Sequence, residues 1–186
     1  MNLINRRFRY TFFNAALGIA LINVVVWLIV QGNPQMNLLL GLNPYLFLHK
    51  HMYWQIFTYM FMHGDFMHLF CNMFGLLMFG ISVERAAGSK EFLLMFFLCG
   101  IVDGLLSLGV YVLTGSYGVL LIGASGAVYS ILLAFAVIYP TAKIFLFGMA
   151  ANVAHMTHLF GFAAAWIYFI VRMGINPLKV WKDAWR

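Results

Sequence analysis

Residues 123–135 read GASGAVYSILLAF, and the uncharged, apolar run that they open continues to Pro140. A hydroxyl group between glycines at one end of such a run has two interpretations. Small residues along apolar helices commonly let neighbouring membrane helices approach closely. A serine at a helix end is also a candidate nucleophile once a base lies beside it. The choice for Ser125 depends on residues elsewhere in the chain.

The composition indicates an integral membrane protein. Of the 186 residues, 64% are hydrophobic and 9% are charged, whereas soluble domains carry about 25% charged residues. Several apolar stretches reach the ~20 residues that cross a bilayer core as a helix. Because lipid offers no hydrogen bonds to the backbone and barrel-like alternation is absent, we expect an all-α, polytopic helical bundle.

One transmembrane domain over residues 1–186 is expected, without repeats or domain boundaries. The connection over residues 32–63 is too apolar for a solvated loop, so we expect it to lie in the membrane interface, with Tyr53 and Trp54 as anchors. Cys71 and Cys99 fall within apolar runs and are interpreted as small core residues. The membrane helices are expected at about 11–30, 66–83, 91–113, 122–139 and 153–172.

The basic residues predict the orientation of the chain in the membrane. Arginines precede the first apolar run and a basic tail follows the last, so both ends are placed in the cytoplasm by the positive-inside rule. The net charge of +6 is assigned to this orientation and not to a nucleic-acid partner. Short loops and the lack of targeting features suggest a bacterial inner membrane.

Polar residues recur at the predicted starts of three helices. His68 and Asn72 are four residues apart and share a helix face, and His158 opens the last helix. If these ends lie on one side of the membrane, they meet Ser125 at one depth. Histidine is the usual base for a serine nucleophile, and His68, Asn72 and the Ser125 backbone N–H could donate to the oxyanion of an acyl-transfer intermediate.

These residues have other interpretations. No His-Glu-x-x-His pattern occurs, which argues against a zinc protease, and five acidic residues are too few for a di-iron site. Ligation of haem by two histidines stays open on spacing alone. Asp103 lies inside a predicted membrane helix, where it is a functional candidate or a hydrogen-bonded structural residue, and it is left unassigned.

Five segments in the same order resemble the motifs of the rhomboid intramembrane serine proteases. The resemblance covers most of the chain. The matching segments are Trp54-Gln55 with Thr58, residues 63–72 (HGDFMHLFCN), residues 84–88 (ERAAG), residues 123–126 (GASG) and residues 154–161 (AHMTHLFG).

The resemblance implies cleavage of peptide bonds in transmembrane substrates by a Ser125–His158 dyad, without metal or cofactor. His158 is preferred to His155 because Gly161 follows it at the family's spacing. A catalytically inactive rhomboid-like protein that binds transmembrane clients is the main alternative, and the oligomeric state is left open. The resemblance makes His68, Asn72 and the Ser125 amide the oxyanion donors, with Tyr129, His63, Gly123, Gly126 and Gly161 in supporting roles.

The spacing between Ser125 and His158 is too short for a complete bundle of this type. Eleven residues, 144–154, remain for the return to the side where Ser125 lies. As a helix they would rise only about 16 Å, roughly half of the bilayer core. About 20–35 residues, one helix with its connections, are therefore predicted to be missing between about Phe147 and Ala151. Either the recorded sequence omits it or the protein has lost it.

Overall fold

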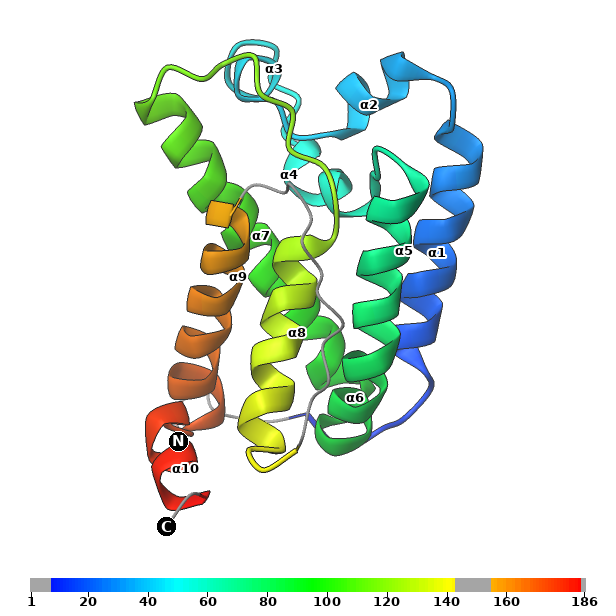
Figure 1. The fold of residues 1–186 in the computed structure, drawn as a ribbon. Coiled ribbons are helices and arrows are strands. Elements are labelled where there is room, and N and C mark those ends of the chain that lie inside the picture. Colours follow the sequence, from blue (N-terminus) through cyan, green and yellow to red (C-terminus); the bar gives the residue numbers. More distant parts are fainter. Residues whose placement is uncertain (1–7, 143–154, 185–186) are drawn as a thin grey trace.

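The structure is a computed structural model that describes residues 8–142 and 155–184, without the side chains of residues 155–157. Within these ranges every regular element is helical, and one isolated bridge joins Leu42 to Leu121. The all-α membrane bundle predicted from the sequence is confirmed (Figure 1). The long elements are α1 (Ala15–Val30), α5 (Phe66–Gly75) continued by η3 (Leu76–Gly80) and α6 (Ile81–Ala87), α7 (Ser89–Leu113), α8 (Ser125–Ile138), and α9 (His155–Tyr168) continued by η4 (Phe169–Met173) and α10 (Pro177–Ala184).

Two of the described helices are long and apolar enough to cross a membrane alone. These are the continuous stretch Phe66–Ala87 and α7, and the bent pair His158–Met173 with α10 is a third candidate. α1 and α8 are apolar but shorter, with 16 and 14 residues. At 1.5 Å per residue, α8 is only about 21 Å long.

The short helix α8 occupies the middle of the bundle. Ala127, Ile131 and Ala134 on α8 are completely buried, and α8 packs against α5, α7 and α9 (Figure 1). Because its neighbours cover α8 on several sides, its length need not match the bilayer. Figure 1 shows that α8 begins well below the upper ends of α1 and α7. Ser125, the first residue of α8, therefore lies inside the bundle and not at its upper end.

α8 and α9 run parallel and cross closely near their first turns. A Cβ atom added to Gly161 would overlap the backbone carbonyl of Gly126. At the other end, the Trp181 indole N–H donates to the Ala136 carbonyl oxygen at 2.9 Å. Small residues at a crossing let helix backbones approach, and here they bring His158 to the first turn of α8.

At the end opposite Ser125, a buried carboxylate joins three segments. Glu84 accepts the backbone N–H groups of Ala15 and Ala16 at 2.6 and 2.9 Å, and the Ser89 hydroxyl at 2.5 Å. The first N–H groups of a helix have no partner within it and favour negative charge. Glu84 therefore caps α1 and fixes it against the α6–α7 turn.

The connection between α1 and α5 folds over the end of the bundle where Ser125 lies. It contains α2 (Pro34–Leu40), α3 (Pro44–His49), α4 (Gln55–Thr58) and the 3₁₀ turn η2 (Tyr59–Phe61). Asn33 and Asn43 cap α2 and α3, and each is followed by the proline that opens the helix. The predicted anchors Tyr53 and Trp54 are 54% and 46% exposed, which suits the interfacial role expected for them.

The helix predicted to be missing between Phe147 and Ala151 lies outside the described residues, as does the start of the helix expected at 153. Both expectations stay predictions. The consecutive helices α8 and α9 begin at the same end of the bundle (Figure 1). Because the chain must return to this end between α8 and α9, a further helix was predicted from the sequence.

Candidate functional site

Ser125 is the first residue of α8 and is 8% exposed. The chain reaches it through residues 119–124, which are held to the connection between α1 and α5. Leu42 and Leu121 exchange backbone hydrogen bonds of 2.9 Å, and the Gly123 N–H donates to the Tyr59 carbonyl oxygen at 3.0 Å. Gly123 has a φ of +115°, a conformation that residues with a Cβ rarely adopt. This turn sets the direction in which α8, and with it Ser125, enters the bundle.

His68 and Asn72 on α5 face that turn. Asp65 caps α5 by accepting the His68 N–H at 2.7 Å, and the Asn72 side-chain amide donates to the His68 carbonyl oxygen at 2.9 Å. A Cβ atom added to Gly123 would lie 2.5 Å from His68 Nε2 and 3.8 Å from Asn72 Nδ2. The His68 Nε2 atom is buried and makes no hydrogen bond. Two polar nitrogens therefore lie beside the segment that leads into Ser125.

His158 on α9 lies against the first turns of α8. Its ring stacks on Tyr129 with 4.0 Å between ring centroids and 17° between ring planes. Tyr129 is four residues after Ser125 and so shares its helix face. The contact between Gly126 and Gly161 holds the two backbones together one turn from His158. The stack and the crossing place the imidazole beside the end of α8 that carries Ser125.

His63 lies behind His68, just before α5. The two rings are 5.0 Å apart and nearly perpendicular, and His63 is 3% exposed with both ring nitrogens unpartnered. Burial, followed by the nearby His68 ring, lowers the pKa of His63 to about 3. His63 is therefore a neutral, buried support for the His68 ring at physiological pH.

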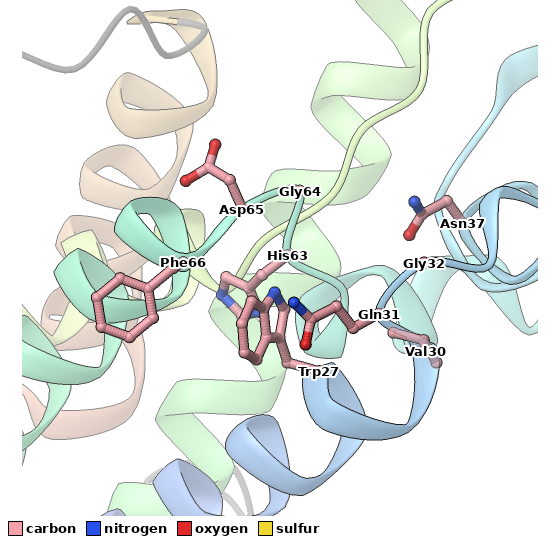
Figure 2. A pocket seen from close by; sticks show the side chains of 9 residues that line it. All are labelled: Trp27, Val30, Gln31, Gly32, Asn37, His63, Gly64, Asp65 and Phe66. Carbon is pink, nitrogen blue, oxygen red and sulfur yellow. The ribbon is translucent and has the colours of Figure 1, made fainter.

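A pocket of about 320 Å³ lies next to this cluster. Figure 2 shows that it is lined from the end of α1, by Trp27 and Gln31, and from the turn before α5, by His63. Ser125, His158 and Asn72 do not line it. His63 lines the pocket, and its ring contacts His68, which lies beside Gly123.

All nine residues singled out in the sequence lie near the first turn of α8. His68 and Asn72 approach this turn from α5, and His158 approaches it from α9. The close contacts around it are made by Gly123, Gly126, Tyr129 and Gly161. His63 lies behind His68. The sequence did not indicate Tyr59 or Asp103 as neighbours. The Tyr59 carbonyl holds Gly123, and Asp103 on α7 reaches Gly126; no local pattern encodes either contact.

The described residues contain no group of three His, Cys, Asp or Glu side chains placed to hold a metal ion. What the arrangement offers is a buried hydroxyl group at a helix start, an imidazole on the same helix face, and side-chain nitrogens beside the preceding turn. These are the elements that serine acyl transfer requires.

Comparison with known proteins identifies the family. Residues 50–175 match the model of the Rhomboid domain. RHOMBOID-like protein 1 of Arabidopsis thaliana is 32% identical over 84 residues, which are 45% of this chain and 20% of that protein. The Bacillus subtilis (strain 168) protein named "Putative rhomboid protease YdcA" is 32% identical over 79 residues, which are 42% of this chain and 38% of that protein. The matched segments thus span well under half of either relative. Because the domain model covers more than half of the 186 residues, this membrane-embedded helical bundle belongs to the rhomboid family.

Proposed function

We propose that this protein is an intramembrane serine endopeptidase that cleaves transmembrane protein substrates. The stack of His158 on Tyr129 is the observation that carries the proposal, because an imidazole next to the helix face of Ser125 is what a general base would require. The name of the Bacillus subtilis relative describes a protease and supports the same activity.

Ser125 is the proposed nucleophile and His158 the proposed general base. In the first step, a ring nitrogen of His158 takes the Ser125 hydroxyl proton while Oγ attacks the substrate carbonyl carbon. The imidazolium then gives this proton to the leaving amine, and an acyl-enzyme remains. A water molecule, deprotonated by His158, attacks the ester, and the released proton restores the Ser125 hydroxyl.

His68, Asn72 and the Ser125 backbone N–H are the proposed donors to the oxyanion. Support comes from the buried His68 Nε2, which has no protein partner, and from the proximity of Asn72 Nδ2 to Gly123. The Ser125 N–H is one of the first amides of α8, which have no partner within the helix. Donors fixed before the reaction stabilise developing charge without reorganising.

The proposal also covers the substrates, the absence of a cofactor and the membrane in which the reaction takes place. Substrates would be other transmembrane segments in the same bilayer, and no metal or cofactor takes part. We infer a bacterial inner membrane with the amino terminus in the cytoplasm, which places the Ser125 end of α8 toward the outer side.

The main alternative is a rhomboid-like protein that binds transmembrane clients without cutting them. The two are separated by reconstituting the purified protein in vesicles with single-span reporter proteins and following both binding and cleavage. We expect cleavage by the native chain, and binding without cleavage by Ser125→Ala. If the native chain binds the reporters but leaves them intact, the protein is not a protease.

A further inference from the structure

Asp103 is a buried acid that the proposed dyad does not use. It lies in the middle of α7 and is 1% exposed. Its Oδ1 atom makes no hydrogen bond, and its Oδ2 atom lies 3.3 Å from the Tyr59 hydroxyl. A carboxyl group inside a membrane bundle is costly, and residues of this kind commonly have a function.

The Asp103 carboxyl group meets the crossing of α8 and α9. A Cβ atom added to Gly126 would overlap this carboxyl group, and Asp103 supplies the three atoms nearest to it. The Gly161 backbone faces the same carboxyl group, and Gly161 itself packs on the Gly126 carbonyl. One side chain of α7 therefore touches both glycines of the crossing. Gly126 follows Ser125 directly, and Gly161 is three residues after His158.

The surroundings of Asp103 favour an uncharged carboxylic acid. Within the described residues, Asp103 forms no ion pair with a Lys or Arg side chain. The Tyr59 hydroxyl has one hydrogen, and the Gly100 carbonyl oxygen at 2.6 Å is a nearer acceptor for it than Asp103 Oδ2. A protonated Asp103 can donate to the Tyr59 oxygen, and it avoids the cost of burying an unpaired charge.

We propose that Asp103 is a positioning residue, which as a neutral acid wedges α7 against the Gly126–Gly161 crossing and so fixes His158 relative to Ser125. This inference rests on the proposed dyad and deepens it. The group acts through the two helices and does not touch the substrate. The positioning depends on the size of the Asp103 side chain and on its hydrogen bonds. It does not need a negative charge.

The test follows covalent labelling of Ser125 by a fluorophosphonate at several probe concentrations. The maximal labelling rate constant (kinact) reports the geometry of the dyad, and the half-saturating concentration (KI) reports probe binding. Misplacing reacting groups by about 1 Å can cost ~100-fold in rate. We expect Asp103→Ala to lower kinact by about 10- to 100-fold and to change KI by less than about twofold.

Asp103→Asn is the decisive variant, because an amide has nearly the shape of a neutral carboxylic acid. We expect it to keep kinact within about threefold of the native value. Ser107→Ala is the matched control: Ser107 is buried one turn further along the same face of α7, and its hydroxyl has no partner. This variant should leave kinact unchanged.

Thermal unfolding of each variant separates positioning from simple stability. Should Asp103→Ala fail to fold, Asp103→Cys nearly keeps the side-chain volume and hydrogen-bonds only weakly, and the same fall in kinact is expected. An unchanged kinact in folded Asp103→Ala or Asp103→Cys would overturn the proposal, as would an Asp103→Asn variant as slow as Asp103→Ala. Failure of the native chain itself to label would instead refute the dyad, and this inference with it.

Discussion

At the scale of single residues, Gly161 sets how closely His158 can approach Ser125. Any Cβ at this position overlaps the Gly126 carbonyl, so a methyl group pushes α9 away from α8. We predict that Gly161→Ala lowers the rate of Ser125 labelling by about 100-fold and destabilises the fold by about 1–3 kcal/mol. Labelling kinetics and thermal unfolding in detergent would measure the two effects.

Gly109 on α7 provides the control for this substitution. A Cβ atom there meets nothing within 4 Å, and alanine is the better helix former by about 0.5–1 kcal/mol. Gly109→Ala should therefore label at the native rate and be at least as stable. Equal behaviour of the two alanine variants would show that the crossing does not position His158.

We predict that the folded chain loses stability in acid because of His63. Its pKa is lowered to about 3 in the folded chain by burial, whereas an unfolded histidine has a pKa of about 6.5. Between these values the unfolded chain binds a proton that the folded chain does not, so stability falls as pH falls from about 6.5, by up to ~1.4 kcal/mol per pH unit.

His63→Gln should flatten this dependence. The comparison is the unfolding free energy of the native chain and of the variant between about pH 4 and 7, in one detergent. The difference between the two proteins isolates His63 from the other histidines. Parallel curves would mean that His63 is accessible to protons in the folded state.

The polar residues around Ser125 could be predicted from the sequence, but two of their neighbours, Tyr59 and Asp103, could not. His68 and Asn72 share a helix face because they are four residues apart. The starts of the helices that carry His68, Ser125 and His158 lie at one depth if these helices begin on the same side of the membrane. The contact of Asp103 with Gly126 depends on how α7 packs against α8. Packing of this kind has no signature in either helix alone, so Asp103 could not be assigned a role from the sequence.

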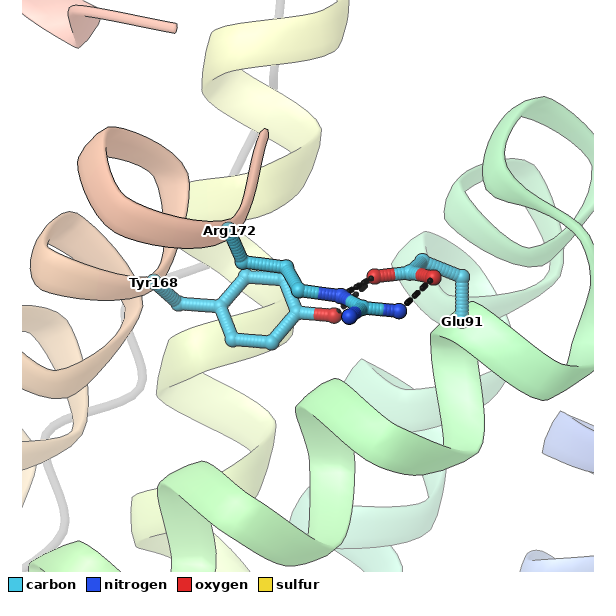
Figure 3. Close-up of polar contacts among 3 residues, drawn as sticks. All are labelled: Glu91, Tyr168 and Arg172. Atoms are coloured by element: carbon cyan, nitrogen blue, oxygen red, sulfur yellow. Dashed lines mark hydrogen bonds and ion pairs between the residues drawn. The ribbon is translucent and has the colours of Figure 1, made fainter. Parts of the chain in front are cut away.

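At the scale of elements, a partly buried ion pair ties the start of α7 to η4, the continuation of α9. Arg172 Nε lies 2.8 Å from Glu91 Oε1, Arg172 Nη2 is 3.1 Å from Oε2, and the Tyr168 hydroxyl donates to the same carboxylate (Figure 3). Glu91 is 4% exposed. The group closes the bundle at the end opposite Ser125.

Breaking this pair on one side should be costly. Arg172→Met leaves the Glu91 carboxylate buried without its cation, which costs about 3–5 kcal/mol. Replacing both partners, as Glu91→Gln with Arg172→Met, should recover most of that loss. Unfolding midpoints in mixed detergent micelles would measure both variants. A single variant as stable as the double would show that Glu91 is not buried as a charge.

The sequence anticipated the helices better than their internal geometry. Apolar runs and flanking Gly, Pro and charged residues mark helix ends, and the observed α7, Ser89–Leu113, begins two residues before its predicted start at 91. The π-helical turns η3 and η4 were not foreseen, because tertiary packing and not composition inserts the extra residue. The shortness of α8 follows from its central position, which the apolar run did not reveal.

At the scale of the whole molecule, the two described ends of the chain meet on one side of the bundle. Arg172 lies over the Phe8 ring at 5.1 Å, and the Tyr10 hydroxyl donates to the Arg85 carbonyl oxygen. Ser125 lies toward the opposite end of α8. An orientation with the basic side inward therefore predicts that both ends face the cytoplasm.

Cysteine labelling tests this orientation. In a chain with Cys71→Ser, Lys182→Cys should be protected from a membrane-impermeant maleimide in intact cells and should react after lysis. Ser116→Cys, in the turn after α7, should react in intact cells. The reverse pattern would place the basic side outside and contradict the proposed topology.

Intact-mass spectrometry of the detergent-purified protein, before and after treatment with a fluorophosphonate, tests the proposed dyad most directly. We predict one adduct per chain in the native protein, no adduct in Ser125→Ala, and strongly slowed labelling in His158→Ala. The reaction needs an activated serine but no knowledge of the substrate. A well-folded native chain without any adduct would contradict the dyad and favour a rhomboid-like protein that binds its clients without cleaving them.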